Sequence, residues 1–134
     1  MESIKVLIAY DDDEIRNHLT LILNQIENVE VIGESNNPYD LCEKIKKLKP
    51  SMVFLKYNFS DKINGIDIIK MCENIVNEEL PIFNFITDNL SKEEFIEIKS
   101  LIGDKMNSII RENSDTRFKE IIEDYIAYIK NKKG

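Results

Sequence analysis

The chain has 134 residues, 43% hydrophobic and 32% charged, which is typical of one globular domain, so we expect residues 1–134 to form a single domain. Its net charge of −7 argues against direct binding of nucleic acid or of anionic membranes. No apolar run approaches membrane-spanning length, and the acid near the N-terminus is atypical of a signal peptide. We therefore expect a cytoplasmic protein with no membrane partner.

The first half of the chain alternates between strand and helix patterns. Strands are predicted at residues 4–9, 29–32 and 52–55, where short runs are rich in Ile, Val and Phe. Asn37 followed by Pro38 indicates an N-cap with proline at the first helical position. Two helices are predicted between these strands, one from Ile15, Leu19, Ile22, Leu23 and Ile26, and one from Leu41, Ile45 and Leu48.

The second half continues the alternation. Asn64 and Gly65 supply a turn and cap before a third helix, and Ser91 to Glu94 has the spacing of a capping box before a fourth. Strands are predicted at 82–86 and 106–110. The apolar faces of the last three helices are Ile68, Cys72, Ile75 and Val76; Phe95, Ile98 and Ile102; and Phe118, Ile121, Ile122, Tyr125 and Ile129.

Five strands alternating with five helices predict an α/β fold, with a parallel sheet covered on both faces by right-handed crossovers. In such folds the chemistry lies beyond the carboxyl ends of the strands. The residues expected at this edge are Tyr10 to Asp13, Lys56 to Asn58, Thr87, Asp88 and Arg111.

Three other residues have a plain structural interpretation. Cys42 and Cys72 lie on separate predicted helices without metal-ligand spacing, and we expect two reduced, partly buried thiols. His18 lies opposite the apolar stripe of the first helix, which favours a surface histidine over a phosphotransfer residue.

Several stretches resemble the receiver domains of two-component response regulators, the CheY-like fold. "IKVLIAYDDDEIRNHL" resembles their first strand and helix, "VEVIGESNNPYDLCEKIKKLKPSMVFL" the elements up to the third strand, and "NGIDII" the third helix. The resemblance implies a doubly wound sheet with strand order 2-1-3-4-5. It also implies an aspartate after strand 3 that accepts phosphate from a histidine kinase, beside Mg²⁺ held partly by two acids after strand 1.

The matching positions depart from this pattern. Tyr10 replaces the first acid, Asp11 retains the second, and Lys56 stands where the acceptor aspartate is expected. Asn58 occupies the position whose backbone carbonyl would bind the metal.

Beyond the last two strands, Thr87 fits the hydroxyl position and Arg111 replaces the lysine that contacts the phosphoryl group. Asp12 completes a residual acidic pocket with Asp11, although Asp12 and Asp13 could instead cap the first helix.

Lys56 is the most informative of these residues. An ammonium group has no free lone pair with which to attack phosphorus, so we expect no catalytic residue and no phosphorylation at this position. We expect Lys56 to pair with Asp11, the alternative being a lysine that extends to water. With few oxygens left, Mg²⁺ binding, with Asp11 as the one candidate ligand, is expected to be weak or absent, and no cofactor is expected.

The leading hypothesis is thus a pseudo-receiver, a non-enzymatic signalling domain that acts by contact with a protein partner or an output domain. The resemblance implies a working surface on helix 4, strand 5 and helix 5, used for an effector or a homodimer, with Leu101, Tyr125 and Tyr128 as candidates. One alternative is an active receiver that uses Asp11 or Asp12. Another is a small Mg²⁺-dependent phosphatase with Asp11 as nucleophile, assisted by Thr87 and Lys56.

Overall fold

The computed structural model describes residues 3–59, 62–87, 90–103, 106–110 and 115–133, of which 102, 106–110, 115–116 and 129–133 are described by backbone alone. In this part of the chain all neighbouring strands pair in parallel, in the order β2-β1-β3-β4-β5. The predicted doubly wound, parallel α/β fold is confirmed. The strands are β1 (Ile4–Ala9), β2 (Val29–Ser35), β3 (Met52–Lys56), β4 (Ile82–Ile86) and β5 (Met106–Ile110).

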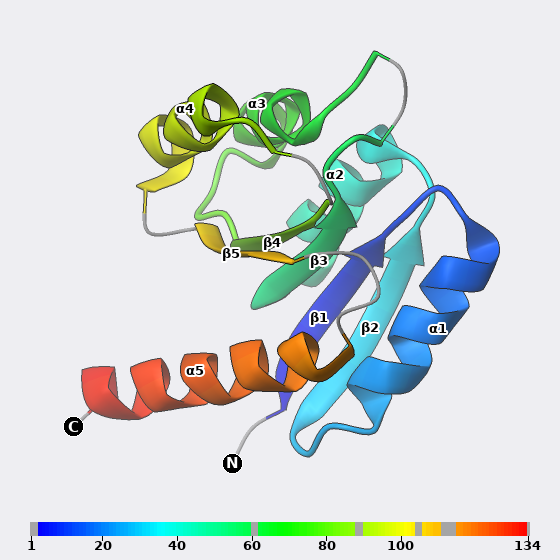
Figure 1. Cartoon of the computed structure of the whole chain (residues 1–134), viewed down its shortest axis with the longest axis vertical. Helices are drawn as coiled ribbons and strands as arrows, with labels where there is room; N and C mark the ends of the chain where they lie inside the picture. Colours follow the sequence, from blue (N-terminus) through cyan, green and yellow to red (C-terminus); the bar gives the residue numbers. More distant parts are fainter. Residues whose placement is uncertain (1–2, 60–61, 88–89, 104–105, 111–114, 134) are drawn as a thin grey trace.

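Helices cover both faces of the sheet, as Figure 1 shows. Buried residues of α1 and α5 join one core cluster, and those of α2, α3 and α4 join a second on the opposite face. The described helices are α1 (Asp13–Asn24), α2 (Pro38–Leu48), α3 (Gly65–Val76), α4 (Lys92–Ile102) and α5 (Asp115–Lys133). Within the described residues, none of these helices is long and apolar enough to cross a membrane.

The alternation of side chains along β3 determines on which face of the sheet each residue packs. Met52 and Phe54 belong to the cluster on the α1/α5 side, whereas Val53 and Leu55 belong to the cluster beneath α2, α3 and α4. By the same alternation Lys56 extends toward the α1/α5 side of the strand ends, and Tyr57 packs into the opposite cluster. Two consecutive residues are thereby directed to different parts of the molecule.

Side chains at the helix starts do what the sequence predicts. Asn37 accepts hydrogen bonds from the backbone N–H groups of Tyr39 and Asp40, at 2.8 and 3.3 Å. Ser91 and Glu94 form the predicted capping box at α4. Asn64 caps α3 in a second capping box, with Asp67 as its partner. Each cap satisfies N–H groups that the helix itself leaves unpaired.

Other predictions need correction. β2 continues to Ser35, three residues beyond the predicted end, because Tyr10 donates its backbone N–H to the Ser35 carbonyl at 3.0 Å and extends the pairing. Cys42 and Cys72 are fully buried, not partly, and lie against each other between α2 and α3.

Candidate functional site

The candidate site is an ion pair at the carboxyl edge of the sheet. Lys56 Nζ lies 3.2 Å from Asp11 Oδ1 and 3.5 Å from Oδ2. The two side chains meet because β1 and β3 are neighbours, with Ala9 beside Leu55 in the register, so Lys56 at the end of β3 lies close to Asp11 just beyond β1. The predicted pairing is confirmed. The side chains of Lys56 and Asp11 are 28% and 44% exposed, so the pair lies at the rim rather than in the core.

Tyr10 supplies the second contact to the lysine. Its ring is 1% exposed within the α1/α5-side cluster, and its centroid lies 5.4 Å from Lys56 Nζ, within the range of a cation–π interaction. Its carbonyl oxygen accepts a hydrogen bond from Arg16 Nη1 at 2.8 Å. An aromatic face therefore stands where the resemblance implies a metal-binding acid, and Lys56 is held between a carboxylate and a ring.

The other acids after β1 belong to the start of α1. Asp12 is the N-cap, because its Oδ1 accepts from the backbone N–H of Ile15 at 3.1 Å. The alternative interpretation of Asp12 as a helix cap is confirmed, and its carboxylate is directed at the helix N-terminus rather than toward Lys56. Asp13 pairs with Arg16, whose Nε lies 3.6 Å from Glu34 Oε1.

Sequence reasoning missed Arg16. Its side chain is 15% exposed, and the guanidinium joins the end of β1, the first turn of α1 and the end of β2 through its contacts with Tyr10, Asp13 and Glu34. Arg16 stands three residues after Asp13, a spacing at which opposite charges meet on a helix. That spacing could have predicted the contact of Arg16 with Asp13, but not its contacts with Tyr10 and Glu34.

Two further predicted positions follow the ends of β3 and β4. Asn58 is exposed and forms an isolated antiparallel bridge with Asn64, which leads the chain into α3. Thr87 follows β4 and is 6% exposed. Arg111 lies outside the described residues. In the part of the chain that is described, no group of three or more His, Cys, Asp or Glu residues is arranged to hold a metal ion.

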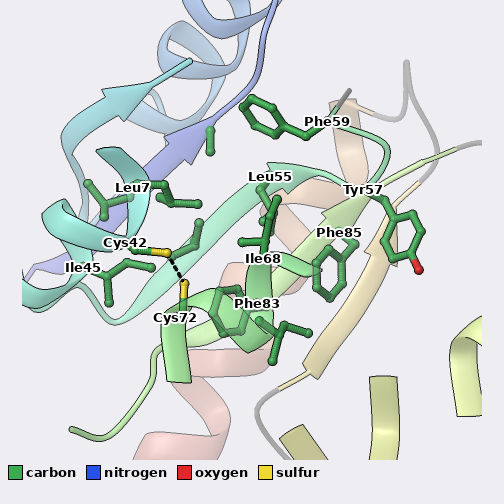
Figure 2. Packing of buried hydrophobic residues seen from close by; sticks show 14 of the residues in the cluster. Leu7, Cys42, Ile45, Leu55, Tyr57, Phe59, Ile68, Cys72, Phe83 and Phe85 are labelled. Carbon is green, nitrogen blue, oxygen red and sulfur yellow. Dashed lines mark hydrogen bonds between the residues drawn. The ribbon is translucent and has the colours of Figure 1, made fainter. Parts of the chain in front are cut away.

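Tyr57 connects the site to α3 and α4. Its ring is fully buried and contacts Phe85 edge-on, with ring centroids 5.5 Å apart (Figure 2). The ring also packs so closely on Gly65 that a Cβ there would lie 2.5 Å from Tyr57 Cδ1. Burial raises the pKa of Tyr57 above its usual value, and the carboxylate of Glu94 on α4 raises it further. The residue after Lys56 is therefore a fixed part of the α3/α4 side of the core.

Comparisons with known proteins show what this chain is similar to. None of the protein-family models matches the chain. The sensory transduction protein LytT of Bacillus anthracis is 32% identical over 92 residues, which are 69% of this chain and 37% of LytT. A protein-glutamate methylesterase/protein-glutamine glutaminase of Clostridium acetobutylicum is 33% identical over 85 residues, 63% of this chain and 24% of the enzyme. The chain thus spans well under half the length of these relatives.

A solved structure extends the likeness to the whole fold. The response regulatory domain of MrkE from Klebsiella pneumoniae superposes with a TM-score of 0.73 at 20% identity, over 95% of this chain and 98% of that domain. The strand order and the placement of helices on both faces are those of a doubly wound parallel sheet. This chain has the CheY-like fold of response-regulator receiver domains, and its sequence is similar to those of sensory transduction proteins.

Proposed function

We propose that this chain is a receiver-like domain of two-component signalling that acts without being phosphorylated, as a pseudo-receiver. The observation that carries the proposal is the Lys56–Asp11 pair, because it occupies the edge of the sheet where a receiver would hold its acceptor carboxylate and metal. In place of a charge that is added and removed, the site holds a permanent cation. We place the domain in the cytoplasm and assign it no enzymatic activity.

The donor set at this edge does not fit Mg²⁺. The ion prefers several oxygen ligands in octahedral geometry. Here the Asp11 carboxylate already contacts an ammonium group, Tyr10 offers a buried ring, and Asp12 caps α1. A divalent cation would also be repelled by Lys56 at close range. We therefore assign the domain no metal-dependent step.

The two alternative functions have less support. An active receiver that used another acid would need a free carboxylate at this edge, and the Asp11 and Asp12 carboxylates both have partners. A phosphatase that used Asp11 as nucleophile would have to break the same ion pair and would need the metal that the donor set does not fit.

Acetyl phosphate with Mg²⁺ tests the proposal. We expect the wild-type chain to show no mass gain of one phosphoryl group by intact-mass spectrometry. Lys56→Asp is the positive control, because it restores an acid at the expected acceptor position. We expect this variant to gain an acid-stable, alkali-labile phosphoryl group. Stoichiometric phosphate on the wild type, lost in Asp11→Asn or Asp12→Asn, would support the active receiver instead. Metal-dependent turnover of a phosphate ester, lost in Asp11→Asn, would support the phosphatase.

We further propose that a protein partner or an output domain binds the surface formed by α4, β5 and α5. Among the predicted candidates Tyr128 is 57% exposed, whereas Leu101 and Tyr125 pack against the core clusters. On α4, the adjacent residues Phe95 and Ile96 are 42% and 57% exposed, and neighbouring exposed apolar side chains can form part of a contact patch. LytT and the methylesterase each extend well beyond the aligned segment, which is consistent with receivers joined to output domains.

Self-association through this surface is testable with matched variants. We expect any dimer of the chain, measured by sedimentation, to be weakened by Ile96→Glu and unaffected by Leu21→Glu. Leu21 is a fair control for Ile96 because it is a 63%-exposed apolar residue on α1, on the opposite face of the sheet from α4. If both variants or neither changed the dimer, a homodimer through α4 would be excluded.

A further inference from the structure

The two cysteines of the chain face each other in the core. Cys42 lies on α2 and Cys72 on α3, thirty positions apart in the sequence, and their Sγ atoms are 2.9 Å apart (Figure 2). Both residues are fully buried. They belong to the cluster beneath α2, α3 and α4, on the opposite face of the sheet from Tyr10. The pair is therefore separate from the Lys56–Asp11 site.

The contact is closer to a covalent geometry than core packing requires. A disulfide bond is about 2.0 Å long, so the two sulfur atoms need to approach by only about 0.9 Å. The side chains already point toward each other from neighbouring helices, as the dashed line in Figure 2 marks. Among the described residues no metal site includes the pair, so zinc binding does not account for the contact.

We propose that Cys42 and Cys72 are a modification site, a dithiol that low-molecular-weight disulfides of the glutathione class oxidise to an intramolecular bridge between α2 and α3. The thiolate of one cysteine attacks the glutathione disulfide, forming a mixed disulfide and releasing one reduced glutathione as thiolate. The second cysteine, as thiolate, then attacks the protein sulfur of the mixed disulfide and releases the second reduced glutathione. Two protein thiols are oxidised and one glutathione disulfide is reduced, so no other oxidant is required.

The opposite pKa shifts of the two thiols favour one order of attack. The hydrogen bond between the two sulfurs lowers the pKa of the Cys42 thiol, and the same hydrogen bond, together with burial, raises that of Cys72. The thiolate is the nucleophile in exchange reactions, so Cys42 makes the first attack. Cys72 is then positioned to complete the bridge within the same molecule.

Burial of the two sulfurs slows both the formation and the reduction of the bridge, without deciding which state is favoured at equilibrium. With both sulfurs at 0% exposure, the oxidant reaches Cys42 only when α2 and α3 separate transiently, so oxidation is slow under native conditions. Once formed, the bridge is shielded from reductants in the same way. It closes a segment that contains β3 and the β3–α3 connection, and so it restrains the unfolded chain.

The test measures the thiol–disulfide equilibrium of the full chain in a glutathione buffer. The equilibrium is reached once from the reduced chain and once from the oxidised chain. One sample starts as the reduced folded protein, and the other is oxidised in urea and then refolded. After alkylation, we expect both to contain a species lighter by two hydrogen atoms, without glutathione attached. By linkage, the bridge should form roughly 100-fold more favourably in the folded than in the urea-unfolded chain.

Single variants separate the bridge from adventitious oxidation. Cys42→Ser and Cys72→Ser should each form at most a mixed disulfide or an intermolecular dimer, and their urea midpoints should not rise on oxidation, whereas that of the wild type should. The proposal is overturned if the two samples converge on free thiols, if the oxidised chain does not refold, or if bridge formation is no more favourable folded than unfolded. Approach from both sides ensures that slow access to the buried sulfurs is not mistaken for failure.

Discussion

Lys56 Nζ lies 3.2 Å from Asp11 Oδ1, and the same ammonium group lies 5.4 Å from the centroid of the Tyr10 ring. The charge at this strand end is thus matched by a carboxylate and an aromatic face that come from one stretch of the chain. From sequence alone we expect a partly dry rim, at which loss of the lysine costs roughly 1–3 kcal/mol. The observed exposure of 28% and 44% lowers that expectation, because solvent screens the pair.

We expect a double-mutant cycle of Lys56→Met and Asp11→Asn to give a coupling free energy of about 0.2–1 kcal/mol, with the combined variant losing less than the sum of the single ones. Urea unfolding of the four proteins measures it. The matched control is Lys70 with Glu97, a more exposed pair at 3.8 Å, for which we expect a smaller coupling. Strict additivity for Lys56 and Asp11 would mean that the lysine merely extends to water.

Lys56→Asp should convert the site from a neutralised pair to two neighbouring carboxylates. Like charges at this distance repel, so we expect lower stability without metal and partial recovery when millimolar Mg²⁺ is added. The wild type should show little response to Mg²⁺. The same urea titration, with and without Mg²⁺, measures both effects, and an equal gain in the two proteins would contradict the proposal that Lys56 keeps a divalent cation from this site.

Gly65→Ala should destabilise the fold by about 1–3 kcal/mol through overpacking. The new Cβ would lie 2.5 Å from Tyr57 Cδ1 and 2.6 Å from Phe85 Cε1, both atoms of rigid, buried rings. Gly33→Ala is the control, because its nearest contact, at 3.0 Å, is the flexible end of Leu7. Chemical denaturation should rank Gly65→Ala well below Gly33→Ala in stability; the reverse order would show that the Tyr57 ring shifts freely.

Tyr57 should make the fold sensitive to alkaline pH. The pKa of its buried hydroxyl is raised above its usual value of about 10. The stability that this shift contributes to the fold is therefore fully present below pH 10. It is lost as pH rises beyond 10, because the tyrosine ionises first in the unfolded chain. The loss is at most about 1.4 kcal/mol per pH unit. Urea unfolding at pH 8 and pH 11 should show a smaller loss for Tyr57→Phe than for the wild type.

The control for this prediction is Tyr39→Phe, since Tyr39 is 61% exposed on α2 and its ring meets solvent whether the chain is folded or not. It should leave the pH dependence of the wild type unchanged. A pH dependence that Tyr57→Phe retains in full would show that another group causes it.

Local sequence signals determined the elements and most of their starts. The strands are short β-branched runs, and the caps at Asn37, Asn64 and Ser91 are local side chain–backbone interactions, so nearby residues suffice to predict them. Element order then implied the parallel sheet, and adjacency of β1 and β3 implied the Lys56–Asp11 contact. Helical periodicity predicted the burial of single residues less well. Ile15 and Phe95 lie in the apolar stripes of their helices, yet they are 37% and 42% exposed.

Only the tertiary structure decided which polar groups the edge of the sheet actually brings together. Tyr10 and Tyr57 both follow strands, yet strand parity and core packing bury one ring beside Lys56 and the other against Gly65. The contact of Cys42 with Cys72 likewise depends on how α2 packs on α3, which no local pattern encodes. Long-range packing sets these distances because each depends on elements that are remote in sequence and meet only when the core closes.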